Sequence, residues 1–178
     1  MEKRKRLFIE LAKRLVLVSS SRTIRVAIDG VDGAGKTTFA DELAGFVAAA
    51  GRPVIRASVD GFHSPKAVRY QRGRHSPEGF FEASYNYVAL KKYLLDPLSP
   101  DGSQRYRRAF FDHVRDDLVP ANEIEASPSS ILLIDGIFLH RSELLAYWDA
   151  SIFLQTEFTA SVARSASRDG SSPDPAAP

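Results

Sequence analysis

The chain has 178 residues, of which 44% are hydrophobic and 26% are charged, with a net charge of +2 and no cysteine. This length suits one domain of ordinary globular composition, and the small net charge argues against a dedicated nucleic-acid-binding protein. The absence of cysteine excludes disulfides, zinc–thiolate sites and thiol nucleophiles, so any metal should have oxygen or imidazole ligands.

Residues 1–20 predict a basic amphipathic helix. Apolar side chains recur at helical spacing, at Leu7, Leu11, Leu15 and Val18, and charged residues interrupt the run. The run is too short for a secretory signal or for the roughly 18 apolar residues of a membrane span. We expect this helix to pack on the domain, with a membrane-surface or acidic-partner role as the alternative. The expected compartment is the cytoplasm.

Four short apolar runs predict buried strands, and helical patterns lie between them. The strands are expected at 23–29, 53–59, 131–139 and 150–155, and the helices at 37–50, 86–95 and 157–168. The segment 63–87 and the loop 120–130 are expected to be irregular. A strand, a helix and a second strand form a βαβ unit, so we expect an α/β fold with a doubly wound parallel sheet flanked by helices.

Residues 30–37 read GVDGAGKT, which matches the P-loop pattern G-x-x-x-x-G-K-[ST] between a predicted strand and a predicted helix. Glycines let backbone N–H groups converge on a phosphate, and the following helix contributes its positive end. Lys36 is expected to reach the β- and γ-phosphates, and the Thr37 hydroxyl to help hold Mg²⁺. The residues predicted to bind the nucleotide are Gly30, Gly33, Ala34, Gly35, Lys36, Thr37 and Thr38.

Two aspartates follow predicted strands, at the carboxyl edge where open α/β sheets bind ligands. Asp135 is expected to orient Mg²⁺ directly or through water, with a role in the following turn as the alternative. Asp60 can take the proton from an acceptor hydroxyl, although an Asp-Gly turn is also common. His63 is a second candidate base or a substrate contact. The charge of Asp32 would oppose phosphates, so we expect it to point away or to reach an acceptor or water.

Arg164 and Arg168 lie four residues apart on one face of the last predicted helix. A lid there would bring them over the transferring phosphoryl group, whose charge they would balance; a solvated helix face is the alternative. Other arginines alternate with aromatic residues in 69–74 and 105–111, as in single-stranded nucleic-acid sites and in phosphate-rich small-molecule sites. Neighbouring acidic residues reduce the positive charge of these segments, so nucleic acid is not the expected partner. The tail, 170–178, has the composition of a flexible segment.

These segments together resemble the uridine kinase-like branch of P-loop kinases, which includes phosphoribulokinase and bacterial pantothenate kinase. The likeness runs from about residue 20 to 169 and rests on GVDGAGKTTFADELA, SVDGFHSP, SPEGFFEASYNYVALKKYLLDPL, RYRRAFFDHVRDD, LLIDGIFL and SVARSASRD. It implies a P-loop NTPase fold in a kinase domain over 21–169, with ATP and Mg²⁺ as cofactors. The implied reaction is phosphorylation of a primary hydroxyl, typically the 5′-OH of a pyrimidine nucleoside.

The resemblance also implies roles for individual residues. It suggests Asp60 as the base, Glu82 as a ribose contact, Phe111 and His113 near the substrate's base, and Arg164 and Arg168 in the lid. Uridine kinases usually carry Glu where Asp135 stands, and their YDF…H region aligns only loosely with FFDHVRDD. The family continues beyond the lid arginines with more lid and a final strand, so we expect both to be incomplete here.

Other readings of the same motifs stay open at this point. The phrase DGAGKTT also resembles thymidylate kinases, but VDGFHSP stands in place of their Arg-Glu-Pro signature. A GTPase switch would need an Asn-Lys-x-Asp motif that reads the base and a D-x-x-G after its strand, and neither is present. A kinase for pantothenate or another small alcohol, and a nucleotide-binding module without turnover, are the remaining alternatives. We expect a nucleoside-like small-molecule substrate, no membrane association, and leave a homo-oligomer open.

Overall fold

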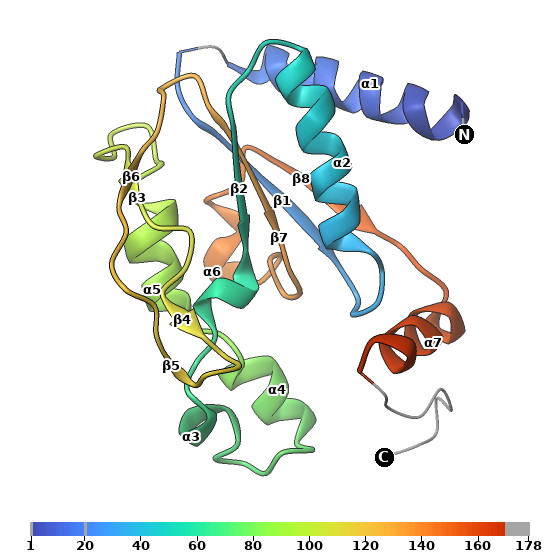
Figure 1. Ribbon diagram of the computed structural model, residues 1–178, viewed down its shortest axis with the longest axis vertical. Coiled ribbons are helices and arrows are strands. Elements are labelled where there is room, and N and C mark those ends of the chain that lie inside the picture. Colours follow the sequence, from blue (N-terminus) through green and yellow to red (C-terminus); the bar gives the residue numbers. More distant parts are fainter. Residues whose placement is uncertain (1, 20, 170–178) are drawn as a thin grey trace.

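The computed structural model describes residues 2–19 and 21–169 (Figure 1), and the expected tail, 170–178, lies outside them. A four-stranded parallel sheet forms the centre, in the spatial order β2 (Val54–Ser58), β7 (Ile131–Asp135), β1 (Ile24–Gly30) and β8 (Ala150–Leu154). The four expected strands are confirmed. The third is shorter than expected, because the chain leaves the sheet after Asp135 and Phe138 has a positive φ of 63°.

Helices and helical turns occupy the connections between the strands. In chain order they are α1 (Glu2–Val18), α2 (Lys36–Ala49), the 3₁₀ helix η1 (Val59–Phe62), α3 (Lys66–Arg69), α4 (Pro77–Ala83), α5 (Tyr87–Leu90), the π-helical turn η2 (Lys91–Leu95), α6 (Ser142–Leu145) and α7 (Phe158–Asp169). The helices expected at 37–50, 86–95 and 157–168 are confirmed to within one residue at each end.

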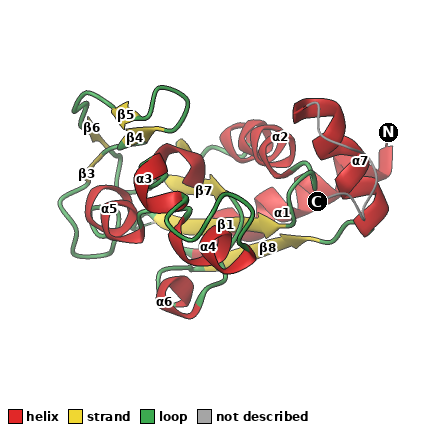
Figure 2. Ribbon diagram, turned by 90° about the horizontal axis from the view of Figure 1, so that it is seen from below, coloured by secondary structure: helices red, strands yellow, loops and turns green. Residues whose placement is uncertain are grey.

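The sheet is covered on both faces, which confirms the doubly wound α/β architecture. On one face, Val26 and Leu133 pack in a core cluster with residues of α1 and α2. On the other, Ala27 and Leu132 pack with residues of α5 and η2. Figure 2 shows α2 on one side of the sheet and α6 on the other. Because both faces are covered, every residue of β1 and β7 is buried, and β7 is apolar up to its last residue, Asp135.

The segment 63–87 is more ordered than the sequence predicts. It contains α3 and α4, so the expectation of an irregular segment is wrong there. The Ser76 hydroxyl accepts a hydrogen bond from the Gly79 N–H at 3.0 Å, and Pro77 occupies the first turn. Serine at the cap followed by proline is a helix-start signal, so α4 was detectable in the sequence.

Two short antiparallel strand pairs lie outside the main sheet, and the second pair falls between the strands of the first along the chain. The pairs are β3 (Arg105–Tyr106) with β6 (Ile124–Glu125), and β4 (Phe111–Asp112) with β5 (Asp117–Leu118). Strands of two residues carry no periodicity that a sequence pattern can reveal. The strand β6 therefore lies, undetected from the sequence, within the segment 120–130 that was expected to be a loop.

Helix α1 packs on α2 through a face one residue away from the expected one. The buried side chains are Phe8, Ala12 and Leu15, whereas Leu7 is 49% exposed. The ring of Phe8 lies 4.9 Å from that of Phe39 and 5.4 Å from that of Phe46, centroid to centroid. The large aromatic ring thus decides which face of α1 is buried. Within the described ranges, neither α1 nor any other helix is long and apolar enough to span a membrane.

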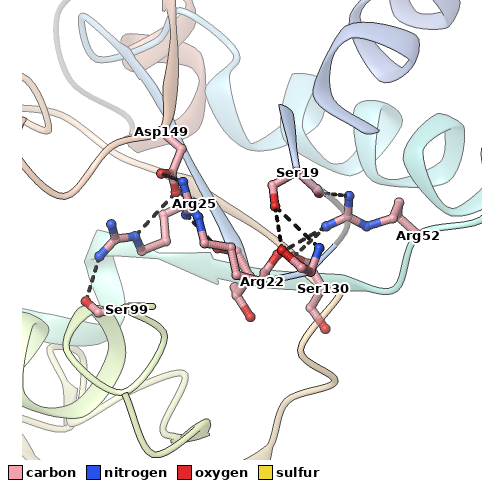
Figure 3. A network of polar contacts seen from close by, with 9 residues as sticks. Ser19, Arg22, Arg25, Arg52, Ser99, Ser130 and Asp149 are labelled. Atoms are coloured by element: carbon pink, nitrogen blue, oxygen red, sulfur yellow. Dashed lines mark hydrogen bonds and ion pairs between the residues drawn. The ribbon is translucent and has the colours of Figure 1, made fainter. Parts of the chain in front are cut away.

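Arg52 ties the end of α1 to the amino edge of the sheet (Figure 3). Its guanidinium donates hydrogen bonds to the carbonyl oxygens of Ser19 and Ser129, and to that of Val16 at 3.3 Å. The carbonyl of Ser130, which precedes β7, accepts another at 3.4 Å. A cation near the last carbonyl groups of a helix is favourable because those groups carry partial negative charge.

A second polar network at the same edge surrounds Asp149, just before β8 (Figure 3). Its carboxylate accepts hydrogen bonds from Arg22 Nη2 at 2.7 Å and from the backbone N–H of Arg25 at 2.8 Å. Arg25 Nη1 donates to the Ser99 hydroxyl at 2.7 Å. The two networks join the amino ends of the strands to α1 and to the segment after η2. Neither network involves the carboxyl edge of the sheet.

The packing of α1 predicts the effect of substitutions on stability. Phe8→Ala should lower the free energy of unfolding by about 3–5 kcal/mol, because it removes a fully buried ring and leaves a cavity. Urea denaturation measures this change. Leu17→Ala, at a position that is 82% exposed on the same helix, is the control and should change the free energy little. Equal effects of the two substitutions would show that α1 does not belong to the core.

Candidate functional site

The P-loop connects β1 to α2 and lies at the carboxyl edge of the sheet. Gly30 has a φ of 152°, and a Cβ atom there would lie 2.7 Å from the carbonyl oxygen of Leu154. Only glycine therefore lets the loop leave β1 alongside β8. The amino end of α2 points its free N–H groups toward the loop, which makes an anion site. This is the geometry that GVDGAGKT predicts.

Lys36 begins α2, and its side chain folds back over the loop. Its Nζ donates a hydrogen bond to the carbonyl oxygen of Val31 at 2.8 Å, and the residue is almost fully buried. Burial lowers the pKa of Lys36, while the nearby carboxylates of Asp32 and Asp29 act in the opposite direction. The ammonium is thus held over the P-loop and largely withdrawn from solvent, where its charge acts strongly.

The exposed Thr37 and the buried Asp135 form a pair of oxygen groups. The Thr37 hydroxyl donates to Asp135 Oδ2 at 2.7 Å, and the Asp135 side chain is only 3% exposed. The register of the sheet, in which Ile28 of β1 lies opposite Asp135 of β7, sets the carboxylate beside the P-loop. Oxygen groups of this kind suit Mg²⁺. Among the described residues there is no group of three or more His, Cys, Asp or Glu side chains that could hold a metal by themselves.

Asp60 lies in η1, directly after β2. The Tyr85 hydroxyl donates to Asp60 Oδ1 at 3.0 Å, and His63 Nε2 lies 3.5 Å from the same oxygen. His63 Nδ1 is 3.0 Å from the carbonyl oxygen of Ser84, which fixes the ring. The contact with His63, and then that with Tyr85, lowers the pKa of Asp60, so the carboxylate is ionised at neutral pH.

One cavity of about 350 Å³ gathers most of the predicted groups. Its wall includes Lys36 and Thr37 from α2, Asp60 from η1, Asp135 from β7 and Arg164 from α7. Gly33, Gly35 and Thr38 line it as well. Asp32 and Tyr85 complete the polar lining, so an ammonium, three hydroxyls, three carboxylates and a guanidinium face one volume. The side chain of Arg168 lies outside the described residues.

Other predicted residues lie away from this cavity. Glu82 is paired with Arg72 at 2.8 Å in a half-exposed ion pair, and Phe111 is buried in its hairpin. The His113 ring lies 4.5 Å from that of His63, centroid to centroid, so it reaches the Asp60 cluster indirectly. Burial, and then the charge of His63, lowers the pKa of His113. The structure thus groups His63 and His113 around Asp60 and leaves Glu82 and Phe111 apart.

A second cavity, of about 490 Å³, adjoins the first and is mainly apolar. Asp32 and Ile137 belong to the walls of both cavities, and Gly30 lines the second. Aromatic rings from α4, from the segment after β7 and from β8 make up much of its wall: Phe80, Phe81, Phe138 and Phe153. Asp32, whose charge was expected to point away or to reach an acceptor, stands where the two cavities meet. A third cavity, of about 530 Å³, is lined by Ala34, Thr38 and Arg164 among others.

The sequence reasoning missed two residues of the site. Tyr85 holds the carboxylate of Asp60, but nothing in its polar-aromatic surroundings distinguishes it from its neighbours. Arg56 Nη2 donates to Asp135 Oδ1 at 2.8 Å. A signal for Arg56 existed, because an arginine in the middle of a predicted buried strand needs a partner.

Comparison with protein families and curated proteins yields a consistent result. A family model described as "Phosphoribulokinase / Uridine kinase family" matches residues 25–172. Among curated proteins, a pantothenate kinase from Nitrobacter hamburgensis is 27% identical over 85% of this chain and 51% of its own length. A pantothenate kinase from Rhodopseudomonas palustris is 29% identical over 74% of this chain and 41% of its own length. The chain thus spans about half, or less, of the length of these relatives.

Two solved structures have the same fold. A protein from Bacillus stearothermophilus described as a "possible uridine kinase" has a TM-score of 0.75 and 24% identity, covering 92% of this chain and 87% of that one. A protein from Silicibacter sp. TM1040 described as a candidate fructose transport system kinase has a TM-score of 0.71 and 26% identity, covering 90% and 80%. These likenesses confirm the P-loop kinase fold.

The contacts of Asp60 predict how its titration responds to substitution. His63→Gln should raise the pKa of Asp60, because it removes the contact that lowers this pKa most, and Tyr85→Phe should raise it less. Carbon-13 NMR of the Asp60 carboxyl group across the acid range measures both shifts. The ionised form stabilises the fold above the unfolded-state pKa, and this contribution is lost as the pH falls through the folded-state pKa.

Val88→Ala, at an exposed position outside the cavity wall, is the control for these titrations and should leave the pKa of Asp60 unchanged. An unchanged Asp60 titration in His63→Gln would contradict the assigned contact.

Proposed function

The chain belongs to the phosphoribulokinase/uridine kinase family of P-loop kinases, and we propose that it transfers the γ-phosphate of ATP to a primary hydroxyl of a nucleoside-like small molecule. The observation that carries this proposal is the cavity shared by Lys36, Thr37, Asp60, Asp135 and Arg164. A nucleotide-binding module would need the P-loop groups alone. A further ionised carboxylate in the same cavity, that of Asp60, is what an acceptor hydroxyl requires.

The P-loop side of the cavity would bind the donor. The amino end of α2 and the Lys36 ammonium would neutralise the β- and γ-phosphates. Thr37 and Asp135 have the oxygen chemistry to hold Mg²⁺, which when bound draws charge from the phosphate oxygens. Arg164 would add positive charge from α7.

Asp60 would act on the acceptor. Its carboxylate would accept the proton of the hydroxyl as the oxygen attacks the γ-phosphorus atom. Tyr85 and His63 both contact Oδ1, so Oδ2 is the oxygen left to face the acceptor. Their contacts would fix the direction of the carboxylate, and correct orientation of a catalytic group itself lowers the barrier to transfer.

The second cavity supports a nucleoside-like acceptor. Its phenylalanine rings offer stacking surface for a flat base, and Ile137 connects it to the catalytic cavity. The arginine in its wall, Arg141, is already paired with Glu143 at 2.6 Å and stacks on Phe81 at 4.2 Å. A carboxylate-bearing acceptor would have to compete for that arginine.

Pantothenate is the second candidate acceptor. The similarity to proteins named pantothenate kinase, at 27–29% identity, favours it. These proteins are about twice as long as the chain, so their acceptor comes to this protein only as a proposal. The cytoplasmic location and a homo-oligomeric state also stay predictions.

Turnover with a panel of acceptors tests the function directly. We expect ADP release to rise when a pyrimidine nucleoside is added with Mg·ATP, and to rise less with pantothenate or fructose.

Lys36→Ala should reduce kcat by about 10²–10³-fold, because a preorganised charge next to the transferred group is lost. Asp60→Asn should reduce it by about 10²–10⁴-fold. If no acceptor stimulates ADP release, the kinase proposal is wrong; unchanged activity in Asp60→Asn sinks only the base assignment.

The aromatic wall predicts a separate effect on the acceptor. Phe80→Ala should raise the KM for the nucleoside by about tenfold and leave the KM for ATP unchanged, because one stacking surface is lost. Steady-state kinetics with each substrate varied in turn separates the two constants. Val88→Ala, exposed on α5 and outside the cavity wall, is the matched control. An equal rise in both KM values would place the acceptor elsewhere.

A further inference from the structure

Arg56 is an unusual neighbour for a residue assigned to a metal. It lies in β2, opposite Leu133 of β7 in the parallel register. Its Nη2 donates to Asp135 Oδ1 at 2.8 Å, and the pair is largely withdrawn from water, with side-chain exposures of 23% and 3%. The other oxygen, Oδ2, accepts the hydrogen bond of the Thr37 hydroxyl. Both oxygens of Asp135 are thus engaged by the protein itself.

The guanidinium is fixed from three further directions. Arg56 Nη1 donates to the carbonyl oxygen of Leu133 at 2.6 Å and to that of Ala57 at 3.1 Å. Arg56 Nε donates to Asp41 Oδ1 on α2 at 2.9 Å. A planar guanidinium with donors satisfied by two strands and a helix cannot turn away without losing several hydrogen bonds. Its positive charge is therefore a permanent part of the site.

A fixed cation beside a buried carboxylate changes what the carboxylate can bind. Arg56 also pairs with Asp41, but that carboxylate is 63% exposed and screened by water, so the guanidinium acts chiefly on the buried Asp135. A divalent cation approaching Asp135 therefore meets a like charge at short range. The described residues offer no further group of three acidic or imidazole side chains to compensate. Mg²⁺ is commonly held by one or two carboxylates together with substrate phosphates. Here the phosphates would have to supply most of the attraction.

We propose that Arg56 is a positioning residue that keeps Asp135 from binding a free divalent cation and makes metal binding depend on the nucleotide. This inference rests on the metal role of Thr37 and Asp135 in the proposed function. Arg56 donates a hydrogen bond to Asp135 Oδ1, which leaves Oδ2 to accept from Thr37. Its positive charge offsets the negative charge of Asp135, which would otherwise attract a divalent cation in the absence of nucleotide. The metal then enters together with the phosphates that it must neutralise.

Binding of Mn²⁺, followed by electron paramagnetic resonance, tests this without any turnover. With the wild-type protein alone, the signal of free Mn²⁺ should persist; with ADP added, it should fall below that of a protein-free sample with the same ADP. Arg56→Gln keeps an amide donor for Asp135 but removes the charge. It should bind Mn²⁺ without nucleotide at least about tenfold more tightly than the wild type.

Two variants serve as controls. Asp41→Asn removes the exposed partner of Arg56 but keeps the buried pair with Asp135, so it should behave like the wild type. Asp135→Asn added to Arg56→Gln should abolish the binding that Arg56→Gln gains. Circular dichroism checks that each variant is folded.

The outcomes separate the inference from the proposed function. If Arg56→Gln gains no Mn²⁺ affinity, or if the wild type binds Mn²⁺ equally well without ADP, the role of Arg56 is wrong while the kinase proposal stands. If Mn²⁺ fails to bind even with ADP, the metal role of Thr37 and Asp135 is wrong as well. The wild-type measurement needs no substitution, so it can overturn the inference even where a variant does not fold.

Discussion

The buried carboxylate of Asp135 is the group on which the geometry of the site depends. A charge with almost no exposure to water is costly unless it is paired and hydrogen-bonded. Thr37 from α2 and Arg56 from β2 provide those partners, so one carboxylate joins the P-loop helix to an edge strand. Because β7 lies between β1 and β2, the P-loop and the segment that carries Asp60 flank the same point. The core of the sheet thus holds the groups of the cavity at fixed positions.

The amino edge of the sheet carries contacts that stabilise the fold, and the carboxyl edge carries the candidate site. At the amino edge, Arg52 and Asp149 each satisfy several partners from separate segments, and α1 adds a buried aromatic ring. At the carboxyl edge, the strands end in the loops that surround the cavities. Substitutions at the first edge should act on folding, and those at the second on binding. A rigid frame with open loops on one side is the usual arrangement for open α/β sheets.

The sequence was informative where a pattern is local and uninformative where a contact depends on register. The strands, the longer helices and GVDGAGKT follow from periodicity, glycine placement and strand–loop–helix order. The buried face of α1 could not be predicted, because it depends on which apolar residue meets the rings of α2. Arg56 and Tyr85 act through partners 79 and 25 residues away, which only the folded sheet brings together. Glu82 and Phe111 rested on the family resemblance, whose alignment is loose around Phe111, and the structure places neither at the cavity.

The segment just after β7 explains why the two cavities adjoin. A Cβ atom at Gly136 would overlap the side chain of Val59, so the chain can pass there only as glycine. Two residues later, Phe138 adopts a φ of 63°, which is rare for a bulky side chain and costs on the order of 1–3 kcal/mol. Its ring packs edge-on against those of Phe80 and Phe81, which offsets part of that cost. This strained turn presents Ile137 to both cavities, so the two volumes share one wall.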